Sequence, residues 1–428
     1  MAGPGLSYQQ GPTLAAPLRL FLLAPLFLML TAGAGVVLAD DWLSGRWSPA
    51  TLALTHLLTL GFLGAVMQGA LLQMLPVVLG SPMPGARWLS GCGLVGLGLG
   101  TPALAAGLLF GAPAWLGIAL ALLALAWLPF LAGLAVALTR TLTGGDLAWP
   151  IRLAALALLV TVYSGLVLAG GLAGWWPLPE LARTVDLHAA WGLFGWVTML
   201  IVGVAYQVVP MLQITPAYPR RISRALIWLL PVGLLVWSLG RLTDQAGAVA
   251  AVALVAAGGG SLLFAATTLY LQQHRRRRLS DTTLAFWRLG MIALGLAALL
   301  HALLGGLPEA WQGPAELSLG LLFLLGFASS VVLGMLYKIV PFLAWFHLQS
   351  QTGARAGSIP NMRDMIAEAA MRRHFRLHLG AVCLLVPAPF LSVWPATLGL
   401  VLLAAGAGLL WLNLRTAQAA FLAYGGRL

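Results

Sequence analysis

Three histidines lie near the ends of three different apolar segments of this chain, at similar depth. They are His56, His188 and His301. Neutral imidazole binds haem iron, copper and zinc, and ionisable residues inside a membrane segment usually have a function. We therefore predict that these histidines are ligands of a metal or haem site, with a purely structural role as the alternative for each.

Residues that follow His188 at helical spacing extend this candidate site. At about 100° per residue, Gly195, Met199, Gly203 and Tyr206 share one helix face with His188. Small residues, a thioether and a phenol then line one groove, which suits a flat macrocycle. We predict Met199 and Tyr206 as further cofactor contacts.

A second set of polar residues lies in three long apolar segments of the chain. Its members are Lys338, Tyr337, Glu316, Gln73 and Gln207. Lys338 is the only lysine in the chain and lies where Gln73 and Gln207 lie in the other two segments. These residues suggest a proton or solute path, or alternatively a lysine amine that extends to the cytoplasmic interface.

Another pair, His374 and His378, is four residues apart and shares one face of a predicted helix on the cytoplasmic side. Arginines surround the pair, namely Arg372, Arg373 and Arg376. Because a positive field opposes metal binding, we predict no metal site there.

The segments that carry most of these residues share one pattern of Gly, aromatic, Gly, long polar residue and Pro. The three copies are Gly61, Phe62, Gly69, Gln73, Pro76; Gly195, Trp196, Gly203, Gln207, Pro210; and Gly326, Phe327, Gly334, Lys338, Pro341. The prolines are 134 and 131 residues apart. Since an internal repeat is a guide to architecture, we predict three four-helix units, residues 1–145, 146–283 and 284–428, within one integral membrane domain.

Composition places the chain in a membrane. It is 61% hydrophobic and 8% charged, against the roughly 25% charged residues of a soluble domain. Only helices satisfy the backbone of such long apolar segments in lipid. The predicted fold is an all-α polytopic membrane protein of twelve transmembrane helices, arranged as three four-helix repeats with pseudo-threefold symmetry. The predicted spans are 17–39, 51–80, 89–111, 114–138, 151–173, 187–212, 224–243, 246–271, 284–305, 316–345, 375–393 and 396–416.

The net charge of +12 follows the predicted topology. Arg46, Arg183 and Arg241 lie on one side of the membrane, and the other twenty lysines and arginines lie on or near the opposite side. The positive-inside rule then places both termini in the cytoplasm of a bacterial cell, with the chain in the inner membrane. We exclude nucleic acid as a partner and expect the run Arg275–Arg278 to contact anionic lipid.

The segment "THLLTLGFLGAVMQGALLQMLPVVLG" resembles the histidine-bearing second helix of the NnrS family, bacterial twelve-helix membrane proteins that bind haem and copper and are linked to nitric-oxide stress. The likeness includes His56, Gly69 and Pro76. More distantly, three arcs of four helices resemble the catalytic subunit of the haem-copper oxidases, including nitric oxide reductases. This resemblance implies haem b and, as a further candidate, copper. His56 would be one axial ligand, and His188 or His301 the second.

The chain departs from both families. NnrS-like proteins carry a second histidine and an acid near the histidine of helix 2, where this chain has Thr55, Leu57 and Leu58. The His-Pro-Glu, His-His and His-x-His motifs of the oxidases are absent. We therefore predict that the protein is not an active oxidase or nitric oxide reductase.

The preferred interpretation is a protein that binds haem near the periplasmic side. Its role would lie in electron transfer, haem or metal handling, or the nitric-oxide response, with a respiratory-chain or periplasmic redox partner. Two alternatives remain open. One is a metal-independent transporter with Gly/Pro-broken helices, and the other is a scaffold for a respiratory complex.

Overall fold

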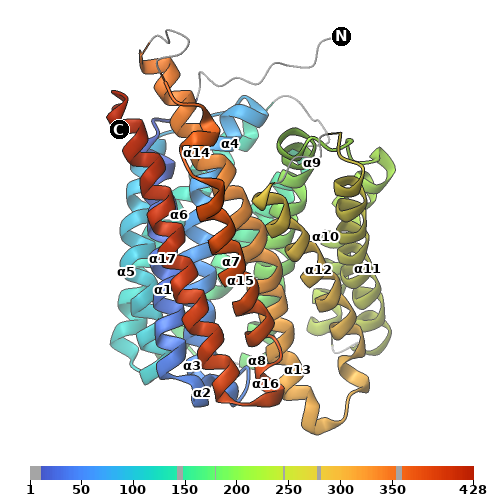
Figure 1. The fold of residues 1–428 in the computed structure, drawn as a ribbon. Coiled ribbons are helices and arrows are strands. Elements are labelled where there is room, and N and C mark those ends of the chain that lie inside the picture. Colours follow the sequence, from blue (N-terminus) through green and yellow to red (C-terminus); the bar gives the residue numbers. More distant parts are fainter. Residues whose placement is uncertain (1–10, 142–147, 179, 244–245, 277–280, 353–358) are drawn as a thin grey trace.

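The computed structural model describes residues 11–141, 148–178, 180–243, 246–276, 281–352 and 359–428, and all regular structure in these ranges is helical (Figure 1). The first half contains α1 (Ala15–Val37), α2 (Ala39–Leu43), α3 (Pro49–His56), η2 (Leu57–Gly64), α4 (Ala65–Leu79), α5 (Ala86–Phe110), α6 (Pro113–Thr139), α7 (Ala148–Leu172), α8 (Leu181–Ala190), η3 (Trp191–Thr198) and α9 (Met199–Gln213). The second half contains α10 (Arg220–Leu242), α11 (Ala246–Gln273), α12 (Thr282–Leu303), η4 (Leu304–Gly306), α13 (Glu309–Leu321), η5 (Leu322–Ser329), α14 (Ser330–Thr352), η6 (Met362–Asp364), α15 (Glu368–Leu385), α16 (Ala388–Leu391) and α17 (Val393–Ala423).

The prediction of an all-helical polytopic membrane protein is confirmed. Within the described residues, eleven helical stretches are long and apolar enough to cross a membrane. The helix α11 lies at the eighth predicted span, 246–271. The longest stretch is Glu309–Thr352, with 44 residues. This stretch extends beyond both ends of the predicted span 316–345. It is also much longer than the roughly 20 residues that cross a hydrocarbon core.

Each of the three patterned segments contains an eight-residue π-helix. These are η2, η3 and η5, and each contains the Gly-aromatic pair of its copy. Their first residues, Leu57, Trp191 and Leu322, are 134 and 131 residues apart, as the prolines are. A π-helix forms i→i+5 hydrogen bonds, is rare, and often occurs at functional sites. These π-helical segments were not predicted from the sequence.

The two glycines of every copy pack against the long helix that precedes the copy. Gly61 and Gly69 lie on Phe27 and Phe21 of α1; Gly195 and Gly203 lie on Ala157 and Pro150 of α7; Gly326 and Gly334 lie on Ala293 and Phe286 of α12. A methyl group at Gly195 would lie only 2.7 Å from Ala157 Cβ. The neighbouring helices therefore occupy the space beside these glycines, as small residues at membrane helix interfaces allow.

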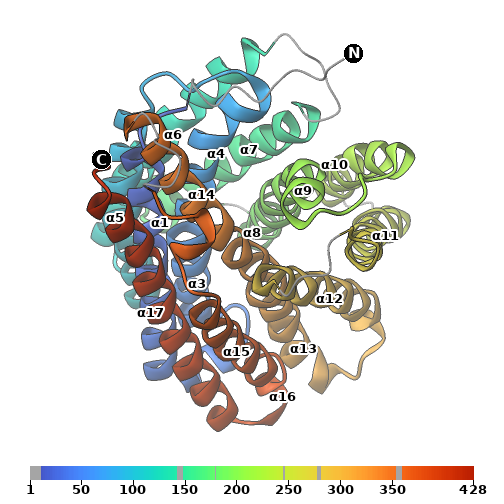
Figure 2. The same cartoon turned by 45° about the horizontal axis from the view of Figure 1, so that its top comes forward.

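The helices form an upright bundle in which the last helix returns to the first (Figures 1 and 2). Contacts join α6 to α7, α11 to α12, and α17 to α1. The patterned segments lie inside the bundle, since η2 contacts η5 and Phe194 of η3 packs on Phe323 of η5. The centre is therefore surrounded by helices from all parts of the chain.

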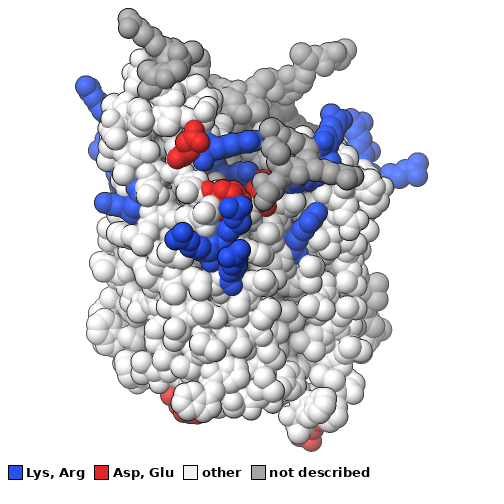
Figure 3. Space-filling model, in the orientation of Figure 1, with Lys and Arg blue, Asp and Glu red and all other residues white. Residues whose placement is uncertain are grey.

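Charge is distributed unevenly along the bundle axis. On the face that Figure 3 shows, lysine and arginine gather towards the end where α4, α14 and the C-terminus lie, which we call the basic end. Only acidic groups are visible at the tip of the other end, where α2, α3, α8 and α13 lie, which we call the opposite end. A wide band without charge separates the two, as expected for a membrane protein.

Candidate functional site

Two of the predicted ligands come together at the opposite end of the bundle. His56 is the last residue of α3, and His188 lies in the last turn of α8. Their rings are nearly parallel, with an interplanar angle of 17° and ring centroids 6.2 Å apart. A π-helix follows each histidine: His56 lies directly before η2, and His188 lies three residues before the first residue of η3.

Hydrogen bonds fix the orientation of both imidazoles. His56 Nδ1 lies 2.7 Å from the carbonyl oxygen of Leu52, one turn earlier. His188 Nδ1 lies 3.1 Å from the carbonyl oxygen of Thr161 and 3.1 Å from Ser164 Oγ, both on α7. A carbonyl only accepts hydrogen bonds, so Nδ1 carries the proton in both rings and Nε2 keeps its lone pair. Metal-ligating histidines commonly have this arrangement.

The spacing of the two rings matches one metal ion between them. A metal–nitrogen bond is about 2.0 Å and a ring nitrogen lies roughly 1.1 Å from the ring centre, so two imidazoles on opposite sides of one ion have centres about 6.2 Å apart. Both rings are half-buried, and Gly165 leaves the space beside His188 Cε1 without a side chain. Among the residues that the structure describes, no group of three or more His, Cys, Asp or Glu could hold a metal ion. The pair therefore offers two ligands, which is the number of axial ligands in a bis-histidine haem.

The other predicted cofactor contacts lie elsewhere. His301, in the last turn of α12, lines the central cavity described below, whereas the His56–His188 pair does not. Met199 is fully buried, and Tyr206 donates a hydrogen bond of 3.2 Å to the carbonyl of Ser223 in α10. Met199 and Tyr206 were predicted to share a face with His188 from the rotation of about 100° per residue in an α-helix. This rotation does not hold through η3, because a π-helix has about one residue more per turn than an α-helix.

Residues of the predicted proton or solute path do not share one cavity. Glu316 lines the central cavity, while Gln73 is buried and Lys338 forms an ion pair of 2.9 Å with Asp281. Gln207 is half-buried in α9, and Tyr337 belongs to a different cluster. The lysine therefore has a local carboxylate partner.

Asp281 connects this lysine to the start of α12. Its carboxylate also accepts hydrogen bonds from the backbone and hydroxyl of Thr283, and so caps the helix. Burial favours a higher pKa for Asp281, but the Lys338 charge and the Thr283 hydrogen bonds outweigh it and lower the pKa below its ordinary value.

A fully buried polar cluster lies between α14, α15 and α17. It contains His374 and His378, which were predicted to lie on the cytoplasmic side among arginines. His374 and His378 are each 1% exposed. Tyr337 OH lies 2.9 Å from His374 Nδ1 and accepts a 2.9 Å hydrogen bond from Asn413, while Ser330 Oγ lies 2.8 Å from His378 Nε2. The arginines nearby in sequence, Arg372, Arg373 and Arg376, face outward from the other side of α15. In the sequence, only the i,i+4 spacing of His374 and His378 indicated that both lie on one face of the helix.

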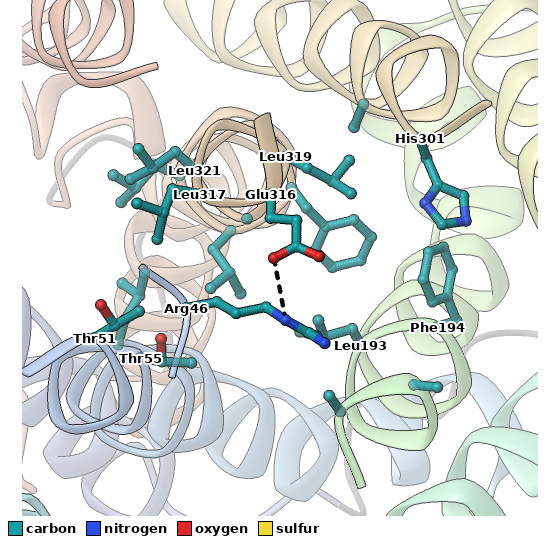
Figure 4. A pocket seen from close by; sticks show the side chains of 18 of the residues that line it. Arg46, Thr51, Thr55, Leu193, Phe194, His301, Glu316, Leu317, Leu319 and Leu321 are labelled. Carbon is teal, nitrogen blue, oxygen red and sulfur yellow. Dashed lines mark ion pairs between the residues drawn. The ribbon is translucent and has the colours of Figure 1, made fainter. Parts of the chain in front are cut away.

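A central cavity of about 640 Å³ opens near the opposite end (Figure 4). Leucine and aromatic side chains cover most of its wall, and α1, α3, α8, α10, α12 and α13 all contribute. Arg46 reaches across it to Glu316, with 3.2 Å between Arg46 Nε and Glu316 Oε2. Glu316 and His301 were both predicted as site residues, but the cavity that they share was not predicted.

No protein-family model matches the chain, and no curated protein matches its sequence.

Proposed function

We propose that the protein binds haem b between α3 and α8, with His56 and His188 as the two axial ligands. The carrying observation is the parallel imidazole pair whose Nδ1 atoms are both hydrogen-bonded to the protein. It supports bis-histidine ligation because both Nε2 lone pairs are free to bind iron. A copper ion on the same two nitrogens is the alternative occupant.

The residues around the pair have defined parts in this proposal. The backbone carbonyls of Leu52 and Thr161 accept hydrogen bonds from Nδ1–H and so hold each ring in the tautomer that ligates a metal. Ser164 supplies a second polar contact to His188, and this contact fixes the ring plane. Bound haem supplies one-electron redox chemistry, so the role we propose is electron transfer or haem handling, including a response to nitric oxide as in the NnrS-like proteins. The partner would be a respiratory-chain or periplasmic redox protein.

The proposal also includes the architecture and its orientation. We propose twelve transmembrane helices in three four-helix repeats around a pseudo-threefold axis, in a bacterial inner membrane with both termini cytoplasmic. Similar glycine contacts in the three copies, and the contacts of α6 with α7, α11 with α12 and α17 with α1, support the repeats. The basic end supports the orientation. Anionic lipid would bind near Arg275 and Arg276; the rest of the predicted arginine run, residues 277 and 278, lies outside the described residues.

An optical spectrum of the purified protein tests the haem proposal. We expect a Soret band with low-spin character in the wild type, and loss of that character in His56→Ala and in His188→Ala. His301→Ala is the matched control and should keep the wild-type spectrum, because His301 lines the central cavity, which His56 and His188 do not line. A folded, monodisperse preparation reconstituted with haem that shows no Soret band would refute the proposal, and metal analysis would reveal copper instead.

Metal-independent transport is a second candidate because a cavity lies at the centre of the bundle. Of the predicted path residues, Glu316 lines this cavity and Lys338 is paired with Asp281. Uptake that survives His56→Ala but is lost in Glu316→Gln would favour transport over haem binding.

A further inference from the structure

The central cavity is an amphipathic space that the haem proposal does not use. Its volume of about 640 Å³ lies in the range of roughly 300–1,000 Å³ typical of sites that hold one small molecule. Gly258 and Gly320 form parts of its wall, and a methyl group on either would meet no atom within 4 Å. The wall therefore leaves an open apolar volume between the helices.

Charged groups gather at one end of this volume. Asp186 pairs with Arg241 at 2.7 Å and with Arg46 at 3.4 Å, and Arg46 also pairs with Glu316. All four side chains line the cavity (Figure 4 shows the Arg46–Glu316 pair). Two arginines and two carboxylates balance in charge, and they come from the segment before α3 and from α8, α10 and α13.

The arginines have more donors than these carboxylates use. A guanidinium carries five N–H donors, and the ion pairs involve two nitrogens of Arg46 and one of Arg241. Within the described residues, Arg241 Nε is buried and has no hydrogen-bond partner. A buried donor without an acceptor is costly, so this end of the cavity favours a ligand that supplies acceptor oxygens.

We propose that the central cavity binds an amphipathic molecule with a single apolar chain or ring system and an acidic head, a carboxylate or a phosphate monoester. The apolar part lies among the leucine and aromatic side chains, and the head accepts hydrogen bonds from Arg241 and Arg46. His56 and His188 do not line the cavity, so this inference is independent of the haem proposal.

Equilibrium binding of radiolabelled palmitate to the full chain tests the proposal. The protein is placed in nanodiscs of phosphatidylcholine, and binding to empty nanodiscs is subtracted. We expect one saturable palmitate site, displaced by hexadecyl phosphate. Acetate, which has only the head, and hexadecanol, which has only the chain, should compete at least about tenfold more weakly, the factor expected for loss of a charged hydrogen bond or of apolar contacts.

Two variants locate the site. Gly320→Phe places a ring at a position that lines the cavity and has open space around its Cβ, and it should abolish saturable binding, whereas Gly33→Phe, on an exposed face of α1 with equally open space, should not change it. Arg241→Gln leaves Asp186 paired with Arg46 and should weaken palmitate binding about tenfold while hexadecanol binding is unchanged.

Four outcomes would overturn the inference. They are full palmitate binding in Gly320→Phe, equal binding of hexadecanol and palmitate, absence of any saturable site, and equal competition by phosphatidic acid, which would identify a two-chain membrane lipid instead. The Soret band should be the same in Gly320→Phe and wild type, so failure of this inference and failure of the haem proposal are distinguishable.

Discussion

The hydrogen bonds of Nδ1 distinguish the two histidine pairs of this protein. In His56 and His188, Nδ1 bonds to carbonyl oxygens and Nε2 remains available. In the buried pair, His374 Nδ1 bonds to Tyr337, and His378 bonds to Ser330 through Nε2. Ser330 thus occupies the Nε2 of His378, and among the described residues the buried Nδ1 of His378 has no hydrogen-bond partner. The first pair is therefore the better candidate for a ligand.

The ion pair between Asp281 and Lys338 predicts a dependence of stability on pH. The pKa of Asp281 is lower in the folded protein than its ordinary value, so the carboxylate stabilises the fold at pH values above about 4. This stabilisation is lost as the pH falls through the lowered pKa of the folded state. Thermal unfolding in detergent, measured from pH 3 to pH 7, should show the loss as a decrease in Tm.

Asp281→Asn provides the matched variant for this measurement. Asparagine still caps α12, so the variant loses the charge but keeps the capping oxygen. We expect the variant to be less stable at pH 7 by about 1 kcal/mol, because the pair is partly exposed, and to show a smaller change in Tm at low pH. If the pH dependence of Tm were the same in Asp281→Asn and the wild type, the Asp281–Lys338 pair would not be the cause of that dependence.

The sequence predicted His56 and His188 as ligands but not the groups that orient them. Leu52 is one turn from His56, whereas Thr161 and Ser164 lie on α7, more than 20 residues before His188 in the chain. Only the packing of α7 on α8 brings them together. Lys338 is a similar case, since its partner Asp281 is 57 residues away and belongs to the start of another helix.

At the scale of the helices, the repeated pattern predicted three equivalent segments but not the π-helix that each of them contains. Apolar periodicity does not distinguish i→i+4 from i→i+5 hydrogen bonding, so η2, η3 and η5 were invisible in the sequence. Thr198 and Ser329, the last residues of η3 and η5, donate hydrogen bonds to carbonyls five residues earlier, Leu193 and Leu324. Copy one has Gly64 at this position, so a hydroxyl is not a requirement of the π-helix.

The glycines of the pattern provide a prediction about helix packing. A methyl group at Gly203 would lie 2.6 Å from Pro150 Cβ in α7, closer than real side chains approach. Gly203→Ala should therefore destabilise the protein by about 1–3 kcal/mol, the usual cost of overpacking. Gly33→Ala is the control, because α1 has open space there, and its Tm should be unchanged or higher. Equal Tm values for the two variants would contradict close packing of α9 on α7.

For the whole molecule, composition was sufficient to predict a helical membrane protein, while its interior was not predictable. The cavity depends on side chains from helices throughout the chain, from α1 to α17, and its wall includes Gly258 and Gly320, which look like ordinary membrane glycines in the sequence. The ion pairs at its mouth join Arg46 to Asp186, 140 residues later in the chain. Such contacts arise only when the bundle closes, with α17 against α1.

The uneven charge of the bundle predicts its orientation in the membrane. If the basic end faces the cytoplasm, a cysteine at Gly313 in α13 is outside and a cysteine at Leu428 is inside. Both sites are exposed, and Cys383 is first changed to serine because it is also exposed, whereas Cys92 is buried. A membrane-impermeant maleimide should label Gly313→Cys in intact spheroplasts, and Leu428→Cys only after lysis. The reverse pattern would place the His56–His188 pair on the cytoplasmic side, and any redox partner would then have to be cytoplasmic.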